Sequence, residues 1–151
     1  MTFAAGDTLP ADRLNVMGCT LRRASNQTLN DATDTTISWD TEVVDTDALW
    51  DAGTPTVITI PETGLWAITF HVARAAAVNA RSLVDIVTSA APWSSLNNFI
   101  RAPWPTGEDR GCGSFTIPLT AADTFTVRVN ADGSGNSTML AGLTCYRVIG
   151  G

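Results

Sequence analysis

The segment from Gly64 to Val72 alternates strictly between two kinds of side chain. Large apolar groups occupy one set of positions, namely Trp66, Ile68, Phe70 and Val72, and the intervening positions hold Leu65, Ala67, Thr69 and His71. A period of two residues predicts a β-strand, because successive side chains of a strand point to opposite faces. One face must therefore be buried in a core, whereas the other is mostly small, which suits close approach of a second surface.

The remainder of the 151-residue chain predicts further short strands within one domain. We expect them at residues 16–23, 37–44, 56–60, 82–89, 114–119, 124–130 and 138–149. A turn-rich connection is expected at residues 25–35, and a long irregular surface segment with at most one short strand at residues 90–112. No segment of ten or more residues has a helical period. The pattern therefore predicts an all-β antiparallel sandwich or jelly roll.

The composition excludes several classes of function. The net charge is −6, and all nine basic residues are Arg, so the basic surface of a nucleic-acid-binding protein is absent. No apolar run is long enough to span a membrane, and the N-terminus lacks the features of a signal peptide, so we expect assembly in the cytosol. Cys19, Cys112 and Cys145 form no CxxC motif; we interpret them as small buried hydrophobes rather than zinc ligands or disulfides.

Catalytic and metal chemistry have little support in the sequence. His71 is the one histidine, and on a strand it is more often a packed or interface residue than a catalytic base. Seven carboxylates lie between residues 31 and 51 but without a DxDxDG calcium loop, so we interpret them as solvated loop charges. Paired carboxylates of the glycosidase kind stay open on the sequence alone, with nothing beyond the abundance of Asp in their favour. We expect no catalytic residues, cofactor or metal.

Several motifs together resemble a known family. Trp39-Asp40, Trp50-Asp51, an apolar strand ending at Pro61, and Gly64-x-Trp66 opening a strand that closes at His71-Val72 are similar to the signature of the complement component 1q and tumour necrosis factor jelly-roll superfamily. Residues 114–130, followed by a Gly-rich loop and a last apolar strand, are similar too. The resemblance spans residues 16–150. It departs at Ala122, where the family has Gly, and in the last strand, where Tyr146 is the one aromatic residue.

This resemblance implies a jelly-roll domain of about ten strands at residues 16–151 that assembles as a homotrimer. In the family, the strand that matches Gly64 to Val72 lies in the inner sheet, whose outer face packs about the threefold axis. We therefore expect Ala67, Thr69 and His71 to line the subunit contact. For the core, we expect the following residues: Ile58, Ile60, Trp66, Ile68, Phe70, Val84, Ile86, Phe115, Ile117, Phe125, Val127 and Leu143.

Residues 1–15 form a leader unlike the rest of the chain. Its apolar points are Phe3, Leu9 and Leu14 in an otherwise polar segment. The leader is similar to short N-terminal segments of tail, fibre and other virion proteins of phages from GC-rich bacterial hosts. We therefore expect an arm that anchors the trimer to other virion proteins. The sequence leaves open whether the protein belongs to the tail or fibre or decorates the capsid.

The segment at residues 90–112 also holds candidate ligand residues. Trp93, Asn98, Arg101 and Trp104 combine aromatic, amide and guanidinium groups, which sugars stack on and hydrogen-bond to. The more frequent role for such Trp residues is to cover the end of a sandwich or a neighbouring subunit. The sequence thus favours a structural phage virion-surface protein, with adhesion to a host-surface glycan as an addition. The alternative is a free-standing carbohydrate-binding or hydrolytic module.

Overall fold

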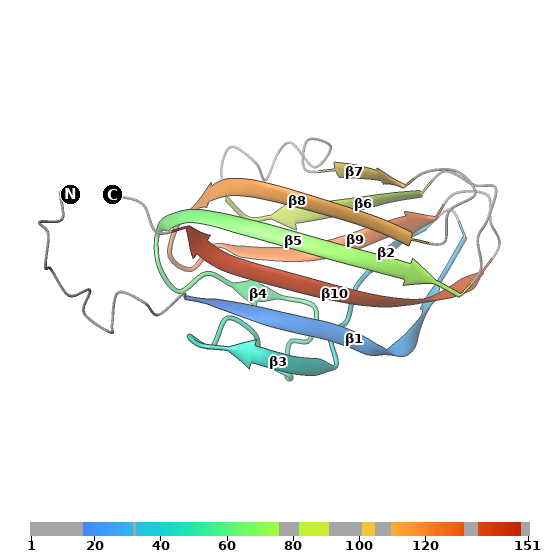
Figure 1. Ribbon diagram of the computed structural model, residues 1–151, viewed down its shortest axis with the longest axis horizontal. Helices are drawn as coiled ribbons and strands as arrows, with labels where there is room; N and C mark the ends of the chain where they lie inside the picture. Colours follow the sequence, from blue (N-terminus) through green and yellow to red (C-terminus); the bar gives the residue numbers. More distant parts are fainter. Residues whose placement is uncertain are drawn as a thin grey trace, which may run out of the picture.

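The protein is a sandwich of two β-sheets (Figure 1). A computed structural model describes residues 17–31, 33–75, 82–90, 101–104, 110–131 and 136–148, with side chains at all of these except residues 82–83, 101–104 and 131. The described residues form ten strands: β1 (Gly18–Leu29), β2 (Asp34–Thr36), β3 (Thr41–Asp45), β4 (Ile58–Thr59), β5 (Gly64–Arg74), β6 (Ser82–Thr88), β7 (Arg101–Trp104), β8 (Arg110–Leu119), β9 (Thr124–Ala131) and β10 (Ser137–Val148). The described residues contain no helix that is long and apolar enough to cross a membrane.

The order of the strands is that of a jelly roll. Sheet A has the order β3-β1-β10-β5-β8, and sheet B has the order β2-β9-β6-β7, with β4 also paired to β9. Every strand pair in the described part is antiparallel. The predicted all-β antiparallel jelly roll is confirmed. The first and last strands of the domain, β1 and β10, lie side by side in sheet A, so the ends of the domain are joined by hydrogen bonds.

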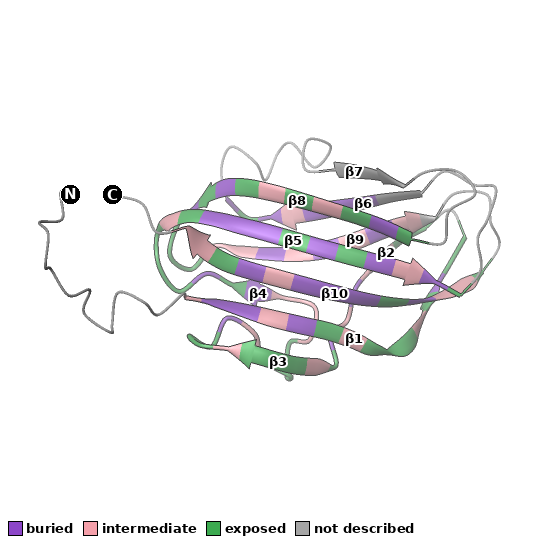
Figure 2. Cartoon of the chain, in the orientation of Figure 1, coloured by how far each residue is buried: buried purple, intermediate pink, exposed green. Residues whose placement is uncertain are grey.

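The core lies between the two sheets and follows the predicted alternation. On β5, Trp66, Ile68, Phe70 and Val72 are all at most 1% exposed, and Figure 2 shows the alternation of buried and exposed residues along the strand. The predicted core residues are all buried except Phe115, which is half-buried and packs against the cluster. Phe115 lies on the edge strand β8, where its ring stacks on Phe70 with centroids 5.8 Å apart.

The predicted turn-rich connection at residues 25–35 was wrong for residues 25–29 and 34–35, which belong to strands. The first strand was expected to end at Arg23 before a long turn, but β1 continues to Leu29, and β2 follows at Asp34. The register of β1 against β10 shifts between Arg23 and Gln27, which marks a β-bulge. The Gln27 side chain replaces missing strand contacts, since Nε2 donates to Thr36 O (2.7 Å) and Oε1 accepts from Ser38 N (2.9 Å).

The predicted strands at residues 37–44 and 56–60 are shorter in the structure. Strand β3 begins only at Thr41, and β4 consists of Ile58 and Thr59. Ile37 and Trp39 are buried as their alternation predicts, but their backbone crosses between the sheets. Ile37 N donates to Val127 O on β9, and Trp39 N donates to Pro55 O. The alternation of residues 37–40 therefore reflects the burial of this crossing segment and does not indicate that it pairs as a strand within one sheet.

Asp40 fixes the bulge in β1 from outside the strand. Its carboxylate accepts hydrogen bonds from the backbone N–H groups of Ala24 (2.7 Å) and Ser25 (2.9 Å) and pairs with Arg23 at 3.4 Å. Desolvation raises the pKa of Asp40, but the hydrogen bonds from Ala24 and Ser25 outweigh it, with a further contribution from Thr41, and hold the pKa at about 2. The acidic half of the Trp39-Asp40 motif thus has a structural role.

Replacing Asp40 with Asn is expected to lower the melting temperature. The neutral amide offers one acceptor oxygen in place of two charged ones. We expect the free energy of unfolding to fall by about 1 kcal/mol; the change is this small because the carboxylate is partly open to water. In a domain of this size that corresponds to roughly 2–4 °C. The pKa of Asp40 is lower in the folded than in the unfolded chain. Its contribution to the free energy of unfolding is therefore fully present above the unfolded-state pKa near 4 and disappears as the pH falls towards the folded-state pKa of about 2.

Differential scanning calorimetry of wild type and Asp40→Asn between pH 2 and pH 7 measures this effect. Asp51→Asn is the matched control, because Asp51 accepts a hydrogen bond from Gly53 N in a surface turn and should change the melting temperature less. A difference between wild type and Asp40→Asn that stays constant down to pH 2 would contradict the assignment.

Candidate functional site

The outer face of sheet A, the one turned away from sheet B, is the surface with the most unusual chemistry. A row of hydroxyl groups crosses its middle, since the register aligns Thr20, Thr144, Thr69 and Ser114 on four neighbouring strands. Thr69 Oγ1 and Ser114 Oγ are 3.0 Å apart, and the hydroxyls of Thr20 and Thr144 are 3.5 Å apart. These short side chains satisfy part of one another's hydrogen bonding. The surface they form is uncharged, and no long side chain projects from it.

Towards one end, the outer face becomes more apolar. Ala67 lies between Tyr146 and Thr116 in the register and is only 7% exposed. Beyond it, Leu65 is 44% exposed, and Tyr146 is 41% exposed. The predicted contact residues Ala67, Thr69 and His71 do share this face, with Thr69 and His71 exposed. Their role in a subunit contact stays a prediction.

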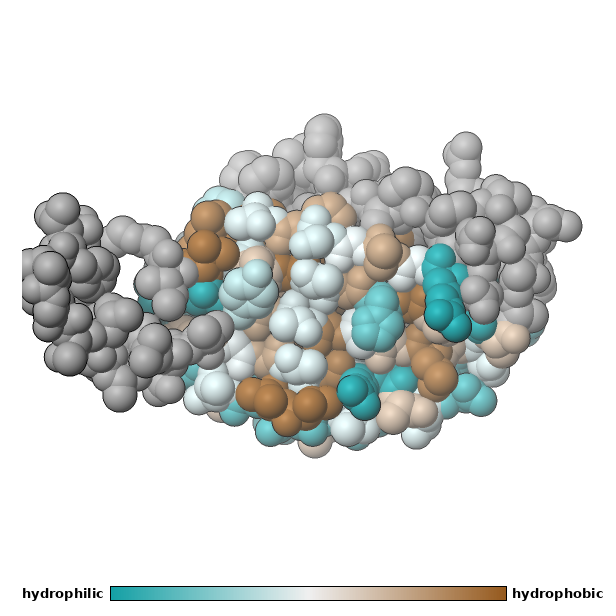
Figure 3. Space-filling model, viewed as in Figure 1, coloured by the Kyte–Doolittle hydropathy of each residue, from teal (hydrophilic) through white to brown (hydrophobic). Residues whose placement is uncertain are grey.

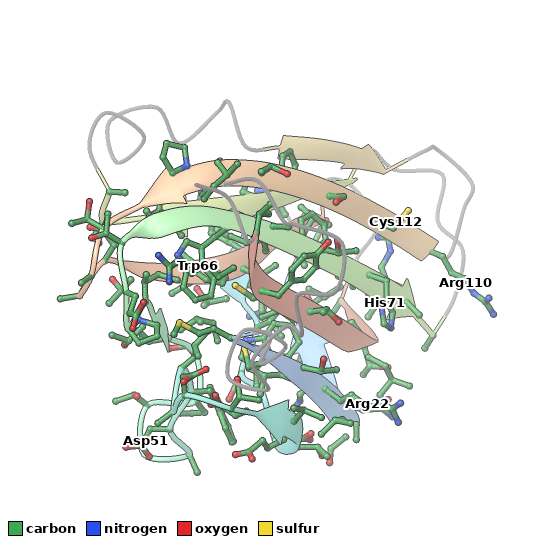
Figure 4. All side chains as sticks on the ribbon, turned by 60° about the vertical axis from the view of Figure 1, so that its left-hand side comes forward. Arg22, Asp51, Trp66, His71, Arg110 and Cys112 are labelled. Carbon is green, nitrogen blue, oxygen red and sulfur yellow. The ribbon has the colours of Figure 1, made fainter. Side chains whose placement is uncertain are left out.

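Towards the other end, the outer face carries positive charge. The register places Arg22, Gly142, His71 and Cys112 in one row across β1, β10, β5 and β8. A methyl group at position 142 would collide with Cε1 of His71, so the imidazole lies over Gly142. Figure 4 shows Arg22, His71, Arg110 and Cys112 along one side of the sandwich, away from Trp66. His71, Arg110 and Cys112 also help to line a hollow of about 460 Å³.

The charge and apolar residues of the chain are unevenly distributed over this surface. The chain has 15 acidic residues, yet none of the described side chains that the register places on the outer face is a carboxylate. All five exposed large hydrophobic residues of the described part lie on β3, β5 and β10 of sheet A: Val43, Val44, Leu65, Leu140 and Tyr146. Figure 3 shows this face, with a pale middle and strongly hydrophilic colour gathered towards the right-hand end.

The cysteines divide into two kinds, and the prediction that all three are buried was wrong for one. Cys19 and Cys145 are buried partners in the β1–β10 register. Burial, followed by the charges of Asp45 and Glu42, raises the pKa of Cys19 to about 12, and burial also raises the pKa of Cys145. Cys112 is exposed. Its alternation with Ser114 and Thr116, which share its face, is the sequence signal that could have placed it outside.

His71 and Cys112 do not form a nucleophile–base pair. Both are on the outer face, but the imidazole lies over Gly142 on β10, whereas Cys112 is on β8 at the opposite flank of β5. Cysteine catalysis requires the thiol and the base within hydrogen-bonding distance, together with a group that orients the base. No carboxylate of the described outer face is present to orient this histidine.

The acidic residues at positions 31–51 mainly hold turns in place. The Asp45 carboxylate accepts hydrogen bonds from the backbone N–H groups of Asp47 (3.3 Å), Leu49 (3.0 Å) and Trp50 (2.8 Å). This network encloses Ala48, which has a positive φ of 53°. Asp34 pairs with Arg128 at 2.9 Å. In the described ranges, no group of three His, Cys, Asp or Glu side chains could hold a metal ion.

Several predicted residues lie outside the part of the chain that the structure describes. These are the arm residues Phe3, Leu9 and Leu14 and the ligand candidates Trp93 and Asn98. Arg101 and Trp104 are the first and last residues of β7, which forms an edge of sheet B next to β6. This short strand agrees with the one that the sequence allowed at residues 90–112, although β8 begins earlier than predicted, at Arg110. The glycan site stays a prediction.

Comparison with known proteins identifies relatives in structure only. No family model and no curated protein matches the sequence. The globular domain of zebrafish complement 1qA matches with a TM-score of 0.67 at 9% identity, covering 89% of this chain and 98% of that one. Murine APRIL matches with a TM-score of 0.59 at 12% identity, covering 85% of this chain and 98% of that one. Eiger TNF from S. frugiperda matches with a TM-score of 0.58 at 11% identity, covering 90% of this chain and 94% of that one. The chain therefore has a jelly-roll fold like that of complement 1q and tumour necrosis factor domains.

Proposed function

We propose that this protein is a homotrimeric structural component of a phage virion, assembled through the outer face of sheet A. The proposal of a trimer is supported by the chemistry of that face. Its middle consists of short side chains, no carboxylate is among its described side chains, and it borders all the exposed large hydrophobic residues of the described part. Free surfaces of acidic proteins are normally rich in charge, whereas the centres of interfaces are depleted of it. The sequence resemblance supports a threefold arrangement about this sheet.

The role proposed for the trimer is structural and not catalytic. The one histidine of the chain lies over Gly142, and the described residues place no carboxylate beside it on the outer face. The carboxylates of Asp40 and Asp45 accept hydrogen bonds from backbone N–H groups. The proposal of a virion location rests on the resemblance of residues 1–15 to leaders of phage tail, fibre and related proteins. In this arrangement the leader docks on another virion protein, and the jelly roll projects from the particle.

The arm is expected to be needed for incorporation but not for assembly. Replacing Phe3, Leu9 and Leu14 together with Ser in the full chain removes the apolar contacts of the proposed anchor and leaves the jelly roll untouched. The variant is expected to sediment as a trimer but to be lost from purified particles, by at least about tenfold relative to wild type. Quantitative immunoblotting of particles grown with each variant measures this.

The matched control replaces three polar residues of the same leader, Thr2, Asp7 and Thr8, with Ser, Asn and Ser. Equal incorporation of the apolar-arm variant and this control would contradict an anchoring role. The same particles give the copy number of the protein. A handful of copies per particle would place it on the tail, and hundreds would place it on the capsid.

A further inference from the structure

We infer that one end of the sandwich binds an uncharged glycan. All carboxamide side chains of the described part lie towards the end where β1 and β9 finish and β10 starts (Figure 1): Asn26, Gln27, Asn30, Asn130 and Asn136. We call this the amide end. A carboxamide both donates and accepts hydrogen bonds, as a sugar hydroxyl does. Carboxamides gathered at one end therefore suit a ligand that is rich in hydroxyl groups.

Folding brings these residues together from distant parts of the chain. In sheet A, the pairing of β1 with β10 extends to Leu29 and Ser137, which brings the adjoining residues Asn30 and Asn136 to the same level. The backbone N–H group of Asp31 donates to Oδ1 of Asn136 at 3.1 Å. The segment that follows β1 is therefore tied to the residue that precedes β10, and this part of the amide end has a defined shape.

Sheet B contributes an amide and an aromatic residue to the same end. Asn130 of β9 is opposite Asp34 of β2 and donates to its carboxylate at 2.7 Å. Ser82 of β6 pairs with Ala131 on one side and with Trp104 on the other. The backbone of Trp104 therefore lies two strand spacings, about 10 Å, from that of Ala131. Sugars stack on aromatic residues, so the ligand candidate Trp104 and the amides belong to one end of the fold.

Much of the hydrogen-bonding capacity of these amides is available to a ligand. Gln27 is bonded inside the chain through both its oxygen and its nitrogen. Asn26 and Asn30 are exposed, and neither side chain bonds to another described residue. At Asn130 only the nitrogen and at Asn136 only the oxygen is bonded within the described part. Two complete carboxamides, one donor group and one acceptor group therefore face a ligand.

The charges of the amide end favour an uncharged ligand. Asp31 and Asp34 are exposed and stand directly beside the amides to which they are bonded. Carboxylates in this position repel sulfate, phosphate and sialic acid groups. Arg22 and Arg110 belong to the outer face of sheet A, which the proposed trimer covers. This last step rests on the proposed function, whereas the amides themselves belong to a single chain.

Binding of the full chain to an array of immobilised oligosaccharides, some uncharged and some sulfated, phosphorylated or sialylated, tests the inference. We expect wild type to bind uncharged members, and the double variant Asn26→Ala, Asn30→Ala to bind them at least about tenfold more weakly. Thr120→Ala is the matched control, because Thr120 is exposed after β8 at the opposite end and should bind as wild type does. Wild type that binds no uncharged oligosaccharide, or only charged ones, overturns the inference. Equal binding by the double variant and wild type overturns it too.

Trp104 gives a second test of the same site. Trp104→Ala is expected to weaken binding to the same oligosaccharides by at least about tenfold, and Trp104→Phe to restore most of it, because an aromatic face is kept. Melting temperatures verify that each variant is folded. Binding that Trp104→Ala leaves unchanged removes this residue from the site, and a loss that Trp104→Phe shares in full contradicts stacking.

The oligomeric state separates this inference from the proposed function. Each chain carries a complete amide end, so a trimer raises the strength of binding to a surface without changing which oligosaccharides are bound. Sedimentation of the wild-type protein used on the array reports its state. Single chains that bind uncharged oligosaccharides through Asn26 and Asn30 would contradict the trimer and support the glycan site. A trimer that binds none would support the trimer and overturn the glycan site.

Discussion

Ala67→Asp is expected to convert the trimer into folded single chains. Ala67 lies on the outer face between Tyr146 and Thr116, and a carboxylate there would be buried by the next subunit. Removing an unpaired charge from water costs about 3 kcal/mol or more, which corresponds to more than about a hundredfold in affinity for each contact. In the single chain Ala67 lies on the outer face and is not part of the core cluster between the sheets, so the fold should remain.

Sedimentation equilibrium at micromolar concentration measures the change, and circular dichroism reports the fold. Thr59→Asp is the matched control, since Thr59 is an exposed threonine on β4 of sheet B and should leave the trimer intact. Trimers that persist in Ala67→Asp would show that the outer face of sheet A is not the subunit contact. Dissociation in both variants would mean that the loss follows from added charge and not from its position.

Trp66→Ala is expected to lower the free energy of unfolding by about 3–5 kcal/mol. The indole is fully buried, and its Nε1 donates to Glu62 O at 3.2 Å, so the change leaves a cavity and an unpaired carbonyl. Such a loss is a large part of the stability of a typical domain. Phe70→Ala should behave similarly, because Phe70 is buried and stacks on Phe115.

Urea denaturation measures these changes most clearly in the Ala67→Asp background, where unfolding is not coupled to association. Leu65→Ala is the matched control, because Leu65 is the neighbouring residue on β5 but is 44% exposed on the opposite face. It should change the free energy of unfolding by less than about 0.5 kcal/mol. Equal losses for Trp66→Ala and Leu65→Ala would mean that the faces of β5 are assigned the wrong way round.

The sequence predicted burial better than it predicted strand limits. Period-two alternation identified the core residues of β5, β6 and β9 correctly, because burial depends on which way each side chain points. It failed at residues 25–35, where a run of Asn, Asp, Ser and Thr is typical of turns. These residues extend β1 because Asp40 and Gln27 replace the missing ladder hydrogen bonds, and such contacts depend on groups brought together only by folding.

The candidate site shows the same division. Alternation alone placed Ala67, Thr69 and His71 on one face, and the resemblance to a jelly-roll family predicted which face assembles. Neither could predict that Arg22 and Arg110 would lie near His71, since this depends on β1 and β8 joining the same sheet. The same applies to Gly142, which gives the imidazole its resting place.

The sequence by itself determined the class of the fold and the two faces of its strands, because both follow from the local period of the side chains. Only the tertiary structure decided the strand order β3-β1-β10-β5-β8 and with it the composition of the outer face. Strand pairing joins residues far apart in the chain, such as Gly18 and Tyr146, and no local property of either segment specifies its partner. The uncharged row and its cationic end are therefore products of folding, since each strand contributes only one or two of their residues.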